Sequence, residues 1–171
     1  MSAQRWIAWI VLGAWLVWLH ALQAWLGSGG SAWVPDLALV LVFSLVARIE
    51  PKDAPGIVLV AVVARAALAV DPGAALAAGL LGLVLLELLA RGLFELTAPA
   101  WRALFAGALV FAFDAWLAGL HALHAGIGPV PFVRVLAALV PAAFTSAIVS
   151  LALGPALAHL PGLSPLRSRR W

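Results

Sequence analysis

Long apolar stretches, separated by short breaks rich in glycine, proline or charge, make up the pattern of this chain. The breaks are GSGGS at 27–31, EPKDAPG at 50–56, VDPG at 70–73 and GIGPVP at 126–131. A membrane-crossing helix needs roughly 20 predominantly apolar residues, and turn residues of these types separate helices. The pattern therefore predicts one domain, residues 1–171, with helices at 6–26, 34–48, 56–70, 73–96, 100–124 and 132–158.

The second apolar stretch has the most informative ends. Pro35 and Asp36 stand at its front and Arg48 at its back. Proline costs little in the first turn of a helix, and an aspartate there faces the positive end of the helix dipole. We predict a helix that enters a membrane at Pro35 and leaves it near Arg48, with Asp36 just inside one interface. An ionisable group at such a place is expensive, which makes Asp36 a candidate functional residue.

Composition supports a lipid environment. Hydrophobic residues make up 65% of the chain and charged residues 10%, against roughly 45–50% and about 25% in soluble domains. We predict an all-α integral membrane protein with six transmembrane helices. If the loops alternate across the membrane, most basic residues fall on one side of it and Arg134 flanks the other side. The residues on the basic side are Arg5, Arg48, Lys52, Arg91, Arg102, Arg167, Arg169 and Arg170. The positive-inside rule then predicts that both termini are cytoplasmic, with a basic tail at 161–171, and this placement of charge accounts for the high pI without nucleic-acid binding.

Two charged residues fall inside predicted helices. Arg65 lies past the middle of the third helix and should find a carboxylate, because an isolated charge at that depth costs at least about 2.5–3.5 kcal/mol. Asp114 is the best candidate by depth and Asp36 the second, while His121 follows Asp114 on the same helix face. The predicted polar cluster is therefore Arg65, Asp114, Asp36 and His121. It is either a buried ion pair that sets helix register, or a pocket for a ligand or a proton path.

Other polar residues suggest structural roles. Glu87, Arg91 and Glu95 follow one another at i,i+4 spacing, which predicts a self-neutralising ladder. Ser146 and Ser150 also stack at i,i+4, where hydroxyls usually bond to their own helix or to a neighbour.

No catalytic set is present in the pattern. The four histidines form no H-E-x-x-H motif and the chain has no cysteine, so we predict no metal site. No serine stands in a G-x-S-x-G setting, and the loops hold too few residues to build an active site. We predict neither enzymatic activity nor a cofactor.

The layout resembles the MreD family, the rod shape-determining membrane proteins of bacterial cell-wall elongation. The features that carry this resemblance are the Pro35-Asp36-Leu37 entry to the second helix, the total length, the six helices with both ends inside, the helix–turn–helix around Asp71-Pro72-Gly73, and the closing helix with its basic tail. In the third helix the chain departs from the family, reading VVARAALAVDPG where a Gly-Leu-Leu-x-Asp type run is expected.

The resemblance implies a non-catalytic scaffold in the bacterial cytoplasmic (inner) membrane. Its partners would be the lipid bilayer and a single-pass MreC-like protein, within a complex that includes a glycosyltransferase, a transpeptidase and MreB filaments. For a partner surface, the end of the second helix around Trp33, Pro35 and Asp36 offers an aromatic, a fixed turn and an acid. The family layout is also similar to the S components of energy-coupling-factor vitamin transporters. The alternative function is therefore substrate binding, which needs a ligand pocket open to the outside.

Overall fold

The computed structural model describes residues 3–93 and 99–167, and within these ranges the chain is helical, with no strand. The elements are α1 (Ala3–Gly27), α2 (Leu37–Val46), the 3-10 helix η1 (Pro51–Asp53), α3 (Ala54–Ala66), α4 (Gly73–Leu93), α5 (Pro99–Ala125), α6 (Pro129–Leu157) and the 3-10 helix η2 (Ser164–Leu166). The all-α prediction is confirmed, and each predicted apolar stretch forms one α-helix.

Helix length separates these six helices into two groups. In the described part of the chain, α1, α4, α5 and α6 are long and apolar enough to cross a membrane. The other two are shorter than the stretches predicted for them: α2 has 10 residues and α3 has 13. At 1.5 Å per residue they measure about 15 and about 20 Å, less than the roughly 30 Å hydrocarbon core. The chain is therefore an all-α membrane protein in which two of the six helices are too short to span alone.

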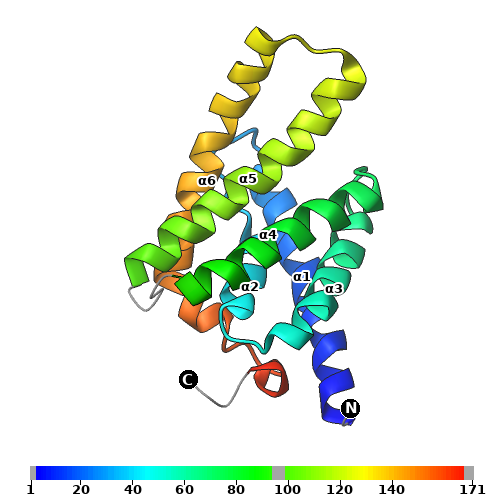
Figure 1. Cartoon of the computed structure of the whole chain (residues 1–171), viewed down its shortest axis with the longest axis vertical. Coiled ribbons are helices and arrows are strands. Elements are labelled where there is room, and N and C mark those ends of the chain that lie inside the picture. Colours follow the sequence, from blue (N-terminus) through cyan, green and yellow to red (C-terminus); the bar gives the residue numbers. More distant parts are fainter. Residues whose placement is uncertain (1–2, 94–98, 168–171) are drawn as a thin grey trace.

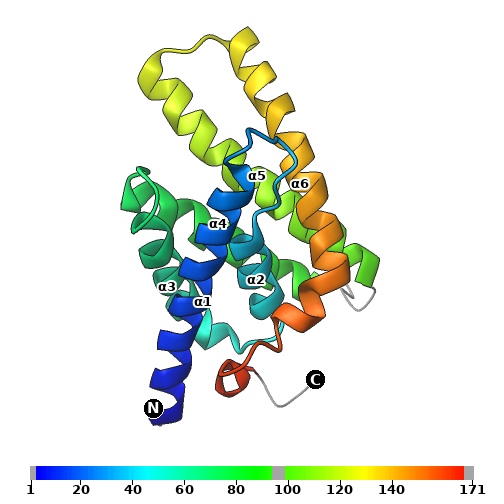
Figure 2. The ribbon, with the colours of Figure 1, turned by 180° about the vertical axis from the view of Figure 1, so that it is seen from behind.

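The short helix α2 forms the centre of the bundle. Every residue of α2 except Leu37 and Ser44 is buried, and α2 packs against all five other α-helices. Figure 1 shows it behind α4, and Figure 2 shows it between α1 and α6. A helix that is buried all round needs apolar residues on every face. This explains why α2 is the most uniformly apolar helix of the chain.

The two longest helices, α5 and α6, pair as a hairpin that extends beyond the rest of the bundle (Figure 1). Their contact is close at Gly107, where an added Cβ would lie 2.8 Å from the Cβ of Ala147 and 3.0 Å from the backbone oxygen of Ala143. Small residues at such a crossing let helix backbones approach each other in lipid. Of the four long helices, α6 is the one least covered by the remainder of the molecule.

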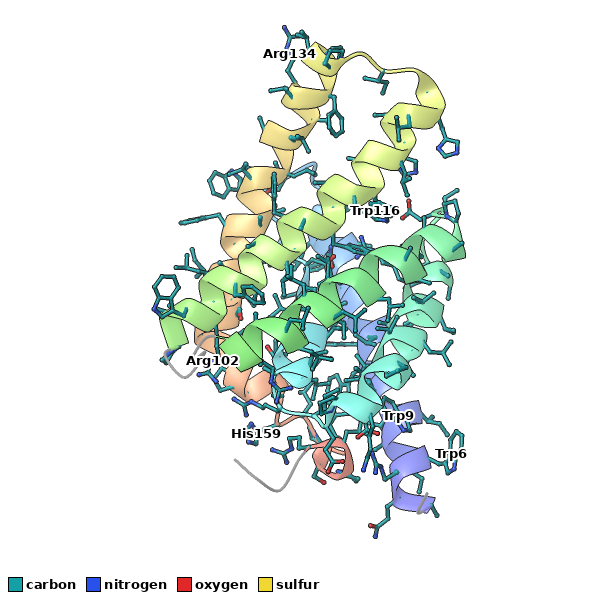
Figure 3. All side chains as sticks on the ribbon, viewed as in Figure 1. Trp6, Trp9, Arg102, Trp116, Arg134 and His159 are labelled. Carbon is teal, nitrogen blue, oxygen red and sulfur yellow. The ribbon has the colours of Figure 1, made fainter. Side chains whose placement is uncertain are left out.

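Basic residues gather at one end of the molecule, which we call the basic end; its described members are Arg5, Arg48, Lys52, Arg91, Arg102 and Arg167. The start of α1 and η2 also lie at this end (Figure 1). Arg5 pairs with Asp53 at 2.6 Å, and Figure 3 places Arg102 at this end and Arg134 at the opposite one. The predicted charge asymmetry is thus present in space, and the cytoplasmic orientation of this end stays a prediction of the positive-inside rule. Arg169 and Arg170 lie outside the described residues.

Candidate functional site

The N-terminus of α2 is fixed by Asp36. Its Oδ1 accepts a hydrogen bond of 2.9 Å from the backbone N–H of Leu39, so the side chain caps the helix. The backbone N–H of Asp36 donates to Oγ of Ser146 on α6, also at 2.9 Å. That hydroxyl in turn donates to the carbonyl of Ala142 at 2.7 Å. The predicted behaviour of Ser146 is confirmed in both respects, and one residue joins the start of α2 to the middle of α6.

Arg65 of α3 lies between two carboxylates. Its Nη1 donates to Oδ2 of Asp36 at 2.8 Å, and its Nη2 is 3.7 Å from Oδ1 of Asp114 on α5. The guanidinium also stands over the ring of Phe113, 4.8 Å from the centroid. The expected order of partners was wrong: Asp36 is the close partner and Asp114 the more distant one. We call Asp36, Arg65, Asp114 and Ser146 the Asp36 cluster.

Asp36 is buried in the interior of the bundle. Asp36 is only 3% exposed, and it begins a helix that ends at the basic end. About 12 residues of helix rise separate it from Arg48, or roughly 18 Å. This separation and its burial place Asp36 inside the bundle, and its depth relative to the membrane interface stays a prediction. Figure 2 shows the reason for the burial: the connection from α1 runs back along the bundle before α2 begins.

His121, the fourth residue predicted for the cluster, lies elsewhere. Its side chain is 65% exposed and its Nε2 is 3.3 Å from Oδ1 of Asp71, in the turn between α3 and α4. Because α5 continues past the end of α3, a residue two turns beyond Asp114 meets that turn and not Arg65. The residue that the pattern failed to identify is His20 of α1, which is close enough to Asp36 and Arg65 to feel their charges. Its position four residues after the buried Leu16 was the available signal.

The three residues predicted for a partner surface occupy different environments. Trp33 is 59% exposed and packs edge-to-face on Phe144 of α6, with ring centroids 6.5 Å apart. Pro35 is half-buried, and Asp36 is buried. Of the three, Trp33 is the most exposed to the surroundings of the bundle.

The chemistry of the Asp36 cluster is that of a packed ion network. Both oxygens of Asp36 accept hydrogen bonds, and the guanidinium has a carboxylate on either side and an aromatic ring below. Breaking such a buried pair is costly because it leaves one charge without compensation. Within the described residues no group of three or more His, Cys, Asp or Glu side chains could hold a metal. The geometry favours the register-setting interpretation of the cluster over the ligand pocket.

A second polar site lies near the basic end. A cavity of about 40 Å³ there, which we call the arginine cavity, is lined by residues of α2, α4, α5 and α6 and the segments next to them, among them Ser44, Arg48, Glu87, Arg102, Ser150 and Pro155. Burial, with Arg102 and Arg167 nearby, lowers the pKa of Arg48. Like charges thus stand close together here, in contrast to the Asp36 cluster.

The charge ladder expected on α4 stays a prediction, because one of its three members lies outside the described residues. Arg91 turns to α2 and donates to the carbonyls of Val46 at 2.7 Å and Ile49 at 3.3 Å. Glu87 is 4% exposed and its Oε2 has no hydrogen-bond partner. Glu95 lies outside the described residues. The ladder was expected from local spacing alone, whereas Arg91 bonds to carbonyls that are distant in the sequence.

No protein-family model, curated protein or solved structure matches this chain.

Proposed function

We propose that this chain is a non-catalytic membrane scaffold that holds a single-pass membrane protein. In line with the resemblance to the MreD family, the partner is MreC-like, and the complex belongs to cell-wall elongation in the bacterial cytoplasmic membrane. The observation that carries the proposal is the aromatic pair of Trp33 and Phe144. Both side chains are more than half exposed. Phe144 belongs to α6, the least covered of the long helices, and Trp33, from the connection before α2, packs on it.

The exposed face of α6 has features that favour a helix in lipid. Helices in a bilayer gain little from apolarity and associate through close packing and a few polar contacts. Pro141 lies inside α6 and has no N–H, so the carbonyl of Ala137 loses its helical donor. Ala137 and Ala138 are small and exposed beside it. The face thus combines room for a close backbone approach, an available carbonyl and an aromatic pair.

The alternative, a substrate-binding transport subunit, has less support from the same structure. It needs a pocket that opens away from the basic end. The polar residues nearest to that description form the Asp36 cluster, in which the carboxylate oxygens of Asp36 and the guanidinium of Arg65 bond to each other and to the backbone. A ligand would have to displace these contacts.

The test is co-purification of the full chain with the MreC-like protein encoded in the same genome. An aromatic anchor at the centre of an interface contributes roughly 2 kcal/mol or more. Trp33→Ala and Phe144→Ala should therefore each lower retention of the partner through detergent extraction by about tenfold or more. Trp6→Ala is the matched control, since Trp6 is 60% exposed against 59% for Trp33, and it should leave retention unchanged.

Two results would count against the proposal. Equal retention by the Trp33, Phe144 and Trp6 variants would remove the aromatic pair from the partner surface. Saturable binding of riboflavin, thiamine or biotin by the purified chain, without retention of a membrane partner, would favour the transport function.

A further inference from the structure

The arginine cavity has cationic groups that the described part of the chain does not neutralise. Neither Arg48 nor Arg102 forms an ion pair with a carboxylate of the described residues. Arg48 lies 3.2 Å from Nδ1 of His159, but that same nitrogen is 2.6 Å from the carbonyl oxygen of Pro155. A contact this short to a carbonyl places the proton on Nδ1, which then cannot accept from Arg48. The two guanidiniums thus favour an anion at the mouth of the cavity.

The inner wall of the same cavity carries an acidic residue, which favours a cation instead of an anion. Glu87 is 4% exposed and lines the cavity, and its Oε2 has no hydrogen-bond partner. A buried acceptor without a donor is costly, more so if it is charged. Arg91, one turn further along α4, donates to the carbonyls of Val46, at the end of α2, and of Ile49 just after it. Glu87 therefore favours a small cation, and the hydroxyls of Ser44 and Ser150 line the cavity as further acceptors.

The dimensions and position of the cavity limit which ligand can place an anion beside the arginines and a cation beside Glu87. Its lining passes from the buried Glu87 and Gly154 to the exposed Leu151 and Pro155 on the outer side of α6. A volume of about 40 Å³ holds about one to three groups of water size, such as an ammonium, but not a whole headgroup. The phosphate of such a headgroup would remain at the mouth, and basic pockets between helices at the cytoplasmic side are suited to lipid phosphates.

We propose that the arginine cavity binds the headgroup of an aminophospholipid. The ammonium enters to Glu87, and the phosphate stays beside Arg48 and Arg102. The exposed Leu151 and the half-buried Phe105, which also line the cavity, lie where acyl chains would pack. Inorganic phosphate or an anionic lipid without an amine satisfies the arginines but leaves Glu87 unpaired. The inference depends on membrane embedding alone and stands whether or not the chain is a scaffold.

The experiment is native mass spectrometry of the full chain with equal concentrations of phosphatidylethanolamine and phosphatidylglycerol. Wild type should retain one phosphatidylethanolamine per chain, with a preference of about tenfold, the value expected for one charge-assisted hydrogen bond. Glu87→Gln should abolish the preference and keep binding of both lipids. The double variant Arg48→Gln with Arg102→Gln should weaken the binding of both lipids by about tenfold or more. Arg134→Gln, at the far end of the molecule, is the control and should behave as wild type.

The outcomes separate the alternatives. Equal binding of the two lipids by wild type, or an unchanged preference in Glu87→Gln, would overturn the ammonium contact, and an absence of saturable lipid would mean that the cavity holds water only. Glycerophosphoethanolamine, which has the headgroup without the acyl chains, should bind far more weakly than the lipid. Tight binding of glycerophosphoethanolamine would identify a soluble ligand and overturn the proposal that the cavity binds a lipid. Thermal melting of each variant in the same detergent shows that it is folded, and loss of lipid binding with an unchanged Tm supports the proposal.

Discussion

The two ends of α2 carry polar sites of opposite design. At its N-terminus, Asp36 bonds to Arg65 at 2.8 Å and caps the helix, with Asp114 close behind. At its C-terminus, Arg48 lies near Arg102 and Arg167 without an ion pair to a described carboxylate. The first site is buried and its charges meet inside the molecule. The second is open at one side and has charges that its own described residues leave uncompensated.

The difference separates residues that hold the fold from residues available for binding. Lipid cannot solvate a charge, so a charge deep in the bundle must be balanced by the protein itself. At the membrane surface, water and headgroups supply that balance, and an uncompensated arginine is tolerated there. Substitutions at the Asp36 cluster should therefore change stability, whereas substitutions at the arginine cavity should change binding.

The largest effect is expected when the Asp36 cluster is broken. Asp36→Ala removes the partner of Arg65 and the cap of α2 together. In soluble proteins, breaking a buried pair costs about 3–5 kcal/mol and losing a cap about 1 kcal/mol. The Tm in detergent should fall most for Asp36→Ala, which also removes the cap, and less for Arg65→Ala. It should fall least for Asp114→Ala, because Asp114 is the more distant partner of Arg65, at 3.7 Å against 2.8 Å for Asp36. Melting of the purified variants measures this order.

A double-mutant cycle tests whether the pair acts as a unit. Combining Asp36→Ala with Arg65→Ala should cost less than the sum of the two single changes, because no charge is then left unpaired. Lys52→Ala is the control, since its contact with Glu50 lies on the exposed surface, where a pair contributes about 0–1 kcal/mol. Strict additivity for Asp36 and Arg65 would mean that the 2.8 Å contact does not stabilise the bundle.

A smaller effect on stability is expected at the contact between α5 and α6, which holds the two sites at a fixed separation. Gly107 of α5 lies between Arg102 and Asp114 in the chain, and a Cβ there would meet Ala147 at 2.8 Å and a backbone oxygen at 3.0 Å. Gly107→Ala should force α5 and α6 apart at a cost of about 1–3 kcal/mol. Gly82→Ala is the matched control, because nothing lies within 4 Å of a Cβ on Gly82. Its Tm should stay the same or rise, and equal losses in both variants would refute a close α5–α6 contact.

Much of the fold follows from local chemistry that the sequence displays. Turn residues separate the six helices, and the Pro35-Asp36 pair marks the start of α2. Glycine also permits a close contact at position 79, since a Cβ on Gly79 would meet the indole of Trp116 at 2.6 Å. These features depend on residues near one another in the chain, or on backbone geometry that only glycine permits.

Depth and pairing could not be predicted in the same way. The stretch 34–48 is apolar on every face, so it indicates burial but not that the helix is short and begins inside the bundle. The choice of Asp36 over Asp114 by Arg65, and the hydrogen bonds of Arg91 to the carbonyls of Val46 and Ile49, depend on how distant helices pack. The cavity between α2, α4, α5 and α6 arises from the same packing and has no pattern of its own in the sequence.

The smallest effect on stability is expected from Arg48→Gln. Together with Arg65→Gln, it compares the arginine near one end of α2 with the arginine near the other. Removing Arg65 leaves a buried carboxylate alone, but removing Arg48 takes away one of three neighbouring positive charges, and burial with Arg102 and Arg167 already lowers the pKa of Arg48. The free energy of unfolding should therefore change by less than about 1 kcal/mol, as for exposed charges generally. Arg65→Gln, the same chemical change, should lower the Tm clearly in parallel melts. If Arg48→Gln destabilises the chain as much as Arg65→Gln does, Arg48 is compensated within the protein and the contrast between the two sites does not hold.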